Sequence, residues 1–119
     1  MTQVLLIEPD IQLADIYEKA LRQEGYNVLQ CREAGEAIAM LDSFPIELVV
    51  IEIQIALHNG IEFLYEMRSY PDWQNLPVII HSFVPKRIIE QNGKIIEQLN
   101  ISEVMYKPVT KLHQLITAV

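Results

Sequence analysis

An unbroken apolar run that ends in a carboxylate is the feature that most constrains the fold of this chain. The run is Leu48–Ile51, and Glu52 follows it directly. Such a run of branched aliphatic residues is typical of a strand that is buried on both faces, as in a parallel sheet. Gly60 and a helical pattern follow within a few residues. The sequence therefore predicts a buried strand that carries an acid to the edge of a parallel sheet.

Strand patterns and helix patterns alternate five times along the chain. The expected strands are residues 4–7, 26–30, 48–51, 77–82 and 103–106. The expected helices are residues 11–24, a helix over 34–41, 60–69, 86–99, and a last helix that Thr110 caps. The pair Asn92-Gly93 lies in the middle of the helix over 86–99 and is expected to kink or split it. This alternation predicts a doubly wound α/β fold with helices on both faces of a five-stranded parallel sheet. The common strand order for such a flavodoxin-like sheet is 2-1-3-4-5.

Composition limits the classes of protein to which the chain can belong. With 119 residues, of which 50% are hydrophobic and 21% charged, residues 1–119 are expected to form one globular domain. The formal net charge of −7 argues against binding of nucleic acid, which requires a basic surface. No apolar run approaches the ~20 residues of a membrane span. The single Cys31 cannot form an internal disulfide, and the N-terminus lacks the basic region of a secretory signal, so we expect a cytoplasmic protein.

Polar residues follow four of the expected strands, where ligands collect in an open α/β sheet. Glu8 and Asp10 follow the first strand, and Glu52 follows the third. Ser82 closes the fourth strand and Lys107 closes the fifth. Lys107 is expected to form an ion pair with Glu52, and Ser82 to donate a hydrogen bond to it. Asp10 is interpreted as the N-cap of the first helix, in preference to a cation ligand.

In order and spacing, these strand-end residues resemble the receiver domain of two-component response regulators, the CheY-like family. The resemblance covers essentially the whole chain. It implies that the acids after strands 1 and 3 would hold Mg²⁺, and that the acid after strand 3 would accept a phosphoryl group from a histidine kinase. It also implies that Ser82 and Lys107 would contact that group. The resemblance further suggests a cis peptide bond before Pro108.

The departures from the family pattern change this expectation. Glu52 stands where the family has an aspartate, and Pro9 stands where it has the second acid of the pair. Phe83 replaces a small residue and is expected to cover the pocket, and Ala56 replaces a proline. The extra methylene of Glu52 moves its carboxylate, and ~1 Å of misplacement costs about a hundredfold in rate. We therefore expect the phosphorylation chemistry to be lost and Mg²⁺ binding to be weak or absent.

Three interpretations of Glu52 remain open at this point. It is a permanent mimic of the phosphoryl group, a structural partner of Lys107, or a true phosphoacceptor. Glu8 and Asp10 are interpreted as a vestigial acidic pocket. The three histidines (His58, His81 and His113) have no metal-ligand spacing, so no metal site is expected.

These residues predict a non-enzymatic signalling module that needs no cofactor. Its expected partner is a protein or a second copy of the chain, bound through residues 86–119 (helix 4, strand 5 and helix 5 of the family). A histidine kinase or an effector domain would be such a partner, whereas nucleic acid and membranes are not expected partners. The alternative is a working Mg²⁺-dependent phosphoacceptor. A small-molecule cofactor binder is disfavoured, because no glycine-rich phosphate loop follows the first strand.

Overall fold

The computed structural model describes residues 2–55, 59–91, 93–108 and 110–119. Its centre is a parallel five-stranded sheet with the order β2-β1-β3-β4-β5, as the sequence predicts. The strands are β1 (Gln3–Ile7), β2 (Asn27–Cys31), β3 (Leu48–Ile51), β4 (Val78–Ser82) and β5 (Glu103–Tyr106). The observed strands lie within one residue of the predicted boundaries.

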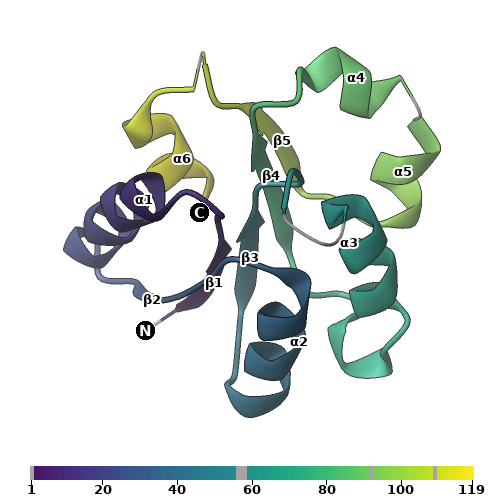
Figure 1. The fold of residues 1–119 in the computed structure, drawn as a ribbon, viewed down its shortest axis with the longest axis horizontal. Helices are drawn as coiled ribbons and strands as arrows, with labels where there is room; N and C mark the ends of the chain where they lie inside the picture. The colour runs from purple at the N-terminus through teal and green to yellow at the C-terminus, as the bar shows by residue number, and fades with distance from the viewer. Residues whose placement is uncertain (1, 56–58, 92, 109) are drawn as a thin grey trace.

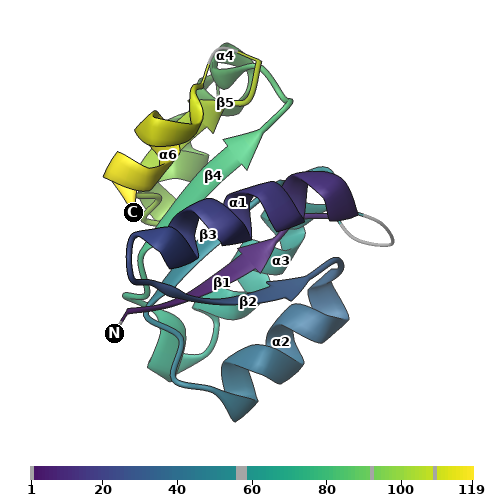
Figure 2. The ribbon, with the colours of Figure 1, turned by 90° about the vertical axis from the view of Figure 1, so that its left-hand side faces the viewer.

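Helices cover both faces of the sheet and make a three-layer molecule (Figure 1). The helices are α1 (Ile11–Gln23), α2 (Ala34–Ser43), α3 (Gly60–Arg68), α4 (Lys86–Glu90), α5 (Gly93–Gln98) and α6 (Leu112–Ala118), with a short 3-10 turn, η1 (Pro71–Trp73). Figure 2 shows α1 and α6 on one face and α2 and α3 on the opposite face. The doubly wound CheY-like fold predicted from the sequence is therefore correct.

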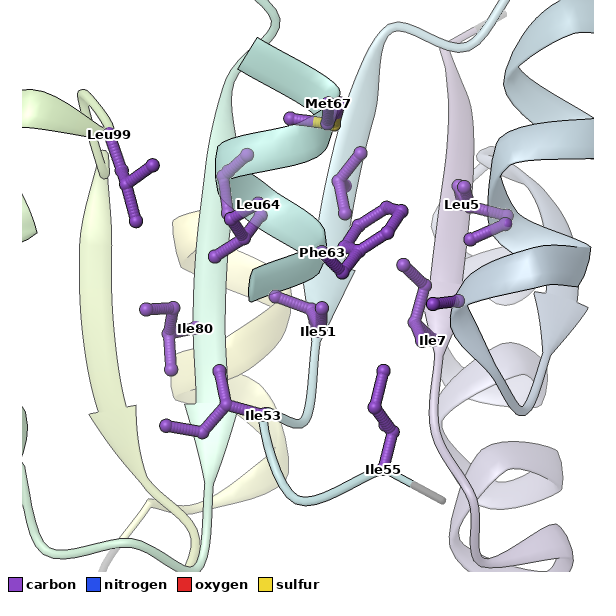
Figure 3. Packing of buried hydrophobic residues seen from close by; sticks show 14 of the residues in the cluster. Leu5, Ile7, Ile51, Ile53, Ile55, Phe63, Leu64, Met67, Ile80 and Leu99 are labelled. Atoms are coloured by element: carbon purple, nitrogen blue, oxygen red, sulfur yellow. The ribbon is translucent and has the colours of Figure 1, made fainter. Parts of the chain in front are cut away.

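Alternate residues of the strands enter two separate cores. Leu5 and Ile7 pack on the side of α2 and α3, whereas Val4 and Leu6 pack on the side of α1 and α6. In the first core, Phe63 and its neighbours on α3 lie against β1 and β3 (Figure 3). Since both faces of the central strands are buried, their sequences are mostly apolar, and β3 (Leu48–Ile51) is apolar at every position.

The helix after β4 is split, which is one of the two outcomes predicted for it, whereas the helix after β5 is not capped by the predicted residue. The helix expected over residues 86–99 is divided into α4 and α5, and α5 begins at Gly93, a residue that costs about 1 kcal/mol in a helix relative to alanine. Thr110 does not cap α6, because its hydroxyl donates to the carbonyl of Tyr106 at 2.7 Å. Instead, Lys111 is the N-cap residue, and its N–H donates to the Gln114 side chain at 2.7 Å.

The expected cis bond before Pro108 is wrong. The described part of the chain contains no cis peptide bond, so Lys107 and Pro108 are joined in the trans form, which X–Pro bonds favour by about 0.5–1 kcal/mol. The Thr110 N–H donates to the carbonyl of Lys107 at 3.2 Å and closes the turn there.

The loop after β3 returns close to the strand before α3 begins. The Gly60 N–H donates to the carbonyl of Ile53 at 2.8 Å. A Cβ atom at Gly60 would lie 2.5 Å from the Ile53 Cα, so this approach requires glycine. Asn59 caps α3 by accepting from the Ile61 N–H at 2.8 Å. The predictions for Ala56 and His58 fall outside the described residues.

Candidate functional site

The carboxyl ends of three strands bring a buried ion cluster together. We define the ion cluster as Glu8 after β1, Glu52 after β3 and Lys107 after β5. The Lys107 ammonium lies 2.5 Å from Glu8 Oε1 and 2.9 Å from Glu52 Oε1. Each of the three side chains is only 3% exposed. The predicted pairing of Lys107 with Glu52 is therefore present, but it is buried and not at a hydrated rim.

Glu52 accepts hydrogen bonds on both carboxylate oxygens. Ser82 Oγ and the Gln54 N–H (3.1 Å) donate to Oε2, and the Phe83 N–H (3.0 Å) and Lys107 donate to Oε1. Burial by itself would raise the pKa of Glu52. The hydrogen bonds from Ser82, Lys107 and the two backbone N–H groups outweigh burial, and the pKa is lowered from its ordinary value. The carboxylate of Glu52 is thus stabilised in its charged form.

Glu8 lies in a less favourable environment than Glu52. Burial raises the pKa of Glu8, and its ion pair with Lys107 offsets this only in part. Among the described residues, the Asp10 N–H at 3.2 Å is the one donor to its second oxygen. The bond between Glu8 and Lys107 was not predicted from the sequence, which paired Lys107 with Glu52 alone. The available signal was that Glu8 ends the strand that lies directly beside β3.

Asp10 belongs to the helix and not to the ion cluster. Its side chain is exposed and accepts from the Leu13 N–H at 3.1 Å. This is the N-cap that the sequence favoured for Asp10 over a cation ligand. Only Glu8 of the predicted vestigial acidic pair therefore reaches Lys107.

Phe83 lies over the ion cluster from the outside. The Lys107 ammonium is 4.7 Å from the centre of the Phe83 ring, within the range of a cation–π contact. The ring is 49% exposed, so its other side faces solvent. The prediction that Phe83 covers the pocket agrees with this contact.

His81 lies beside the site but serves the core. It is buried on β4, and its ring meets the edge of Tyr17 with centroids 5.0 Å apart. Burial, with the nearby Lys107 charge, lowers the pKa of His81 to about 4, so the ring is neutral at pH 7. In the described residues, no three His, Cys, Asp or Glu side chains form a group suited to a metal ion.

The edge strand β5 borders an open groove. The groove has a volume of about 800 Å³ and lies between β5, α4 and α6. Its lining includes Lys86, Met105, Tyr106, His113 and Gln114. It falls within residues 86–119, the segment expected to bind a partner.

Among the described residues, no helix is both long enough and apolar enough to cross a membrane.

The two carboxylates of the ion cluster provide a direct test of the opposite pKa shifts. Above the pKa of an unfolded glutamate, the lowered pKa of Glu52 contributes stability, and this contribution is lost as the pH falls through the folded pKa. The raised pKa of Glu8 has the opposite sign, because its contribution is full below the unfolded pKa and is lost as the pH rises through the folded pKa.

We therefore expect Glu52→Gln to lower the free energy of unfolding at pH 7 by about 1–3 kcal/mol. The matched change Glu8→Gln is expected to leave it unchanged or to raise it, since the amide oxygen still accepts from Lys107. Denaturant unfolding of both variants at pH 7 and about pH 4.5 measures these free energies. The difference in free energy of unfolding between the wild type and Glu52→Gln should be smaller at the lower pH. Equal destabilisation by both changes would contradict the opposite pKa shifts of Glu52 and Glu8.

Comparison with known proteins supports the same family. The sequence model of the response regulator receiver domain matches residues 4–119. The transcriptional regulatory protein CpxR of Klebsiella pneumoniae subsp. pneumoniae is 32% identical over 69 residues, which are 58% of this chain and 29% of CpxR. The response regulator protein GraR of Staphylococcus aureus is 26% identical over 106 residues, which are 89% of this chain and 45% of GraR. The chain thus spans less than half the length of these relatives.

Solved structures agree with the fold. A sensor protein from Polaromonas sp. JS666 has a TM-score of 0.90 at 16% identity, covering 98% of this chain and 91% of the other. The chemotaxis protein CheY4 of Vibrio cholerae has a TM-score of 0.86 at 16% identity, covering 98% and 94%. At these identities the likeness concerns the fold alone, whereas the family match extends over nearly the whole sequence. The chain belongs to the response regulator receiver domain family.

Proposed function

We propose that this receiver domain acts as a phosphorylation-independent protein-interaction module in signal transduction, with Glu52 as a permanent charge at the phosphoacceptor position. One observation carries the proposal: both oxygens of the Glu52 carboxylate already accept hydrogen bonds from Lys107, Ser82 and two backbone N–H groups. A carboxylate that attacks phosphorus needs a free lone pair and an open approach. Glu52 is 3% exposed and offers neither.

The length of the side chain supports the same conclusion. Glutamate has one methylene more than the aspartate that the family uses at this position. In-line phosphoryl transfer requires the attacking oxygen and the donor to be aligned, and ~1 Å of misplacement costs about a hundredfold in rate. The extra length also brings the carboxylate to the Ser82 hydroxyl and the Lys107 ammonium, the groups that the family uses to bind a phosphoryl group. Glu52 is thus suited to replace that group and not to receive it.

The proposed partner surface is the groove beside β5 together with α4 and α6, within residues 86–119. The edge strand and the mixed lining of the groove suit a protein partner, and the net charge of −7 does not suit nucleic acid. Because CpxR and GraR are longer than this chain, an effector domain is one proposed partner and a second copy is another. We further propose that the module has no enzymatic activity and acts in the cytoplasm.

Intact-mass measurement with a small-molecule phosphodonor tests the proposal. The wild-type protein is incubated with acetyl phosphate and Mg²⁺, and its mass is expected to stay unchanged. The double variant Pro9→Asp/Glu52→Asp, which restores the acid set of the family, serves as the matched comparison and is expected to gain one phosphoryl group. A stoichiometric adduct on the wild type would overturn the proposal and support the alternative, a Mg²⁺-dependent phosphoacceptor switched by a histidine kinase.

A further inference from the structure

The position of the Lys107 ammonium bears on the metal ion that the family binds. The ammonium lies between the carboxylates of Glu8 and Glu52, at 2.5 and 2.9 Å. These two acids are the ones that would have to hold Mg²⁺. We propose that Lys107 is a tethered counter-ion that occupies the cation position between Glu8 and Glu52 and keeps divalent metal ions out of the site. This inference rests on the proposed function and extends it to the control of metal binding.

Each carboxylate oxygen of the ion cluster already accepts a hydrogen bond, which disfavours Mg²⁺ at the site as the residues are placed. Glu8 Oε1 accepts from Lys107, and Glu8 Oε2 accepts from the Asp10 N–H. Both oxygens of Glu52 accept from two donors each. Among the described residues, no buried side-chain nitrogen or oxygen lacks a hydrogen-bond partner. Every carboxylate oxygen of the ion cluster therefore already accepts at least one hydrogen bond.

The remaining ligands that Mg²⁺ requires are also missing. Mg²⁺ needs near-octahedral coordination by oxygen at about 2.0–2.1 Å. Pro9 has no side-chain oxygen, and the Asp10 carboxylate is engaged as the cap of α1. A divalent ion would have to displace the Lys107 ammonium from two carboxylates at once, and the Phe83 ring lies over that ammonium. Two buried carboxylates without the ammonium, however, would form a strongly anionic pocket.

Removal of the ammonium is therefore expected to create a site for divalent cations. The experiment compares the Tm of the wild type and of Lys107→Ala with and without MgCl₂, at matched ionic strength. The Tm of the wild type should change by less than about 1 °C, whereas that of Lys107→Ala should rise by roughly 8–10 °C when Mg²⁺ is present at about 100 times its Kd. MnCl₂ titration by calorimetry should give one site in Lys107→Ala.

Two further variants assign the site to the ion cluster. Lys107→Ala/Glu8→Gln removes one of the two carboxylates and should lose the stabilisation by Mg²⁺. Lys19→Ala removes an exposed lysine of α1 and should behave like the wild type. If Lys107→Ala is unfolded without metal, Mg²⁺ should restore its fold. Failure of Mg²⁺ to fold or stabilise Lys107→Ala, or equal stabilisation of the wild type, would overturn the inference.

The outcome is separable from that of the proposed function. A wild-type protein that binds Mg²⁺ but gains no phosphoryl group overturns the counter-ion role alone. A wild-type protein that gains a phosphoryl group without stabilisation by Mg²⁺ overturns the proposed function and leaves the counter-ion role of Lys107 in place.

Discussion

Replacement of Lys107 by methionine is expected to lower the free energy of unfolding by about 3–5 kcal/mol at pH 7, the cost of removing one partner of a buried ion pair. Methionine fills most of the space of the lysine stem but brings no charge and no donor. Glu8 and Glu52, each 3% exposed, would then face each other without the ammonium between them. Two buried like charges with no counter-ion are among the most costly arrangements in a protein.

The pH dependence of this loss identifies its cause. Without the ammonium, burial and mutual repulsion raise the pKa of both carboxylates in the folded protein. Stability gained from a raised pKa is full at low pH and is lost as the pH rises. The deficit of Lys107→Met relative to the wild type should therefore narrow as the pH falls toward about 5.

Denaturant unfolding at pH 7 and about pH 5 measures this deficit, with Lys19→Met on α1 as the matched control for an exposed lysine. The control should stay within about 0.5 kcal/mol of the wild type. If Lys107→Met lowers the free energy of unfolding by less than about 1 kcal/mol, or by an amount that does not depend on pH, the Lys107 charge does not stabilise the two buried carboxylates.

Arg68→Ala is expected to cost about 2–4 kcal/mol, because one guanidinium satisfies four backbone carbonyls. The acceptors are the carbonyls of Trp73 at 2.7 Å, Leu76 at 2.6 Å, Leu99 at 2.8 Å and Asn100 at 3.3 Å. They belong to the connection from α3 to β4 and to the turn between α5 and β5. Arg68 thus joins the connection that follows its own helix to a turn 31 to 32 positions further along the chain, and its loss would remove this donor from all four carbonyls.

A lysine at this position separates the loss of charge from the loss of geometry. Arg68→Lys keeps the charge but not the planar set of five donors, so it should recover less than half of the lost stability. Arg87→Ala removes an exposed arginine of α4 and should change stability by less than about 0.5 kcal/mol. Thermal and denaturant unfolding measure all three variants. An Arg68→Ala protein as stable as Arg87→Ala would show that the hydrogen bonds of Arg68 to the four carbonyls do not stabilise the fold.

The sheet was predictable because burial leaves a direct trace in the sequence. Strands such as β3 are covered on both faces, so each position is apolar and the strand limits are visible. The end of the helix before Gly25 was visible for a local reason, since Gly25 has a φ of +91° that other residues disfavour. The division between α4 and α5 was expected as a kink or a break at the Asn92-Gly93 pair.

The parts that the sequence did not reveal depend on contacts distant along the chain. The pairing of Glu8 with Lys107 crosses 99 positions, and it depends on how far the lysine reaches over the sheet edge. Arg68 at the end of α3 has the pattern of a residue that complements the helix dipole. Its true acceptors are backbone carbonyls, which every residue carries and no sequence pattern marks. Thr110 was a reasonable cap by residue type, but its hydroxyl donates to the Tyr106 carbonyl, and α6 has Lys111 as its N-cap residue.

In the proposed function, the Glu52 charge of the ion cluster takes the place of a transient phosphoryl group. Amide chemical shifts test this most directly, measured by NMR for β5 and α6 in the wild type and in Glu52→Gln, each with and without acetyl phosphate and Mg²⁺. We expect the donor and Mg²⁺ to leave the wild-type shifts unchanged, and Glu52→Gln to move them. Shifts in β5 and α6 that respond to the donor and Mg²⁺ in the wild type, but not to loss of the Glu52 charge, would contradict the account.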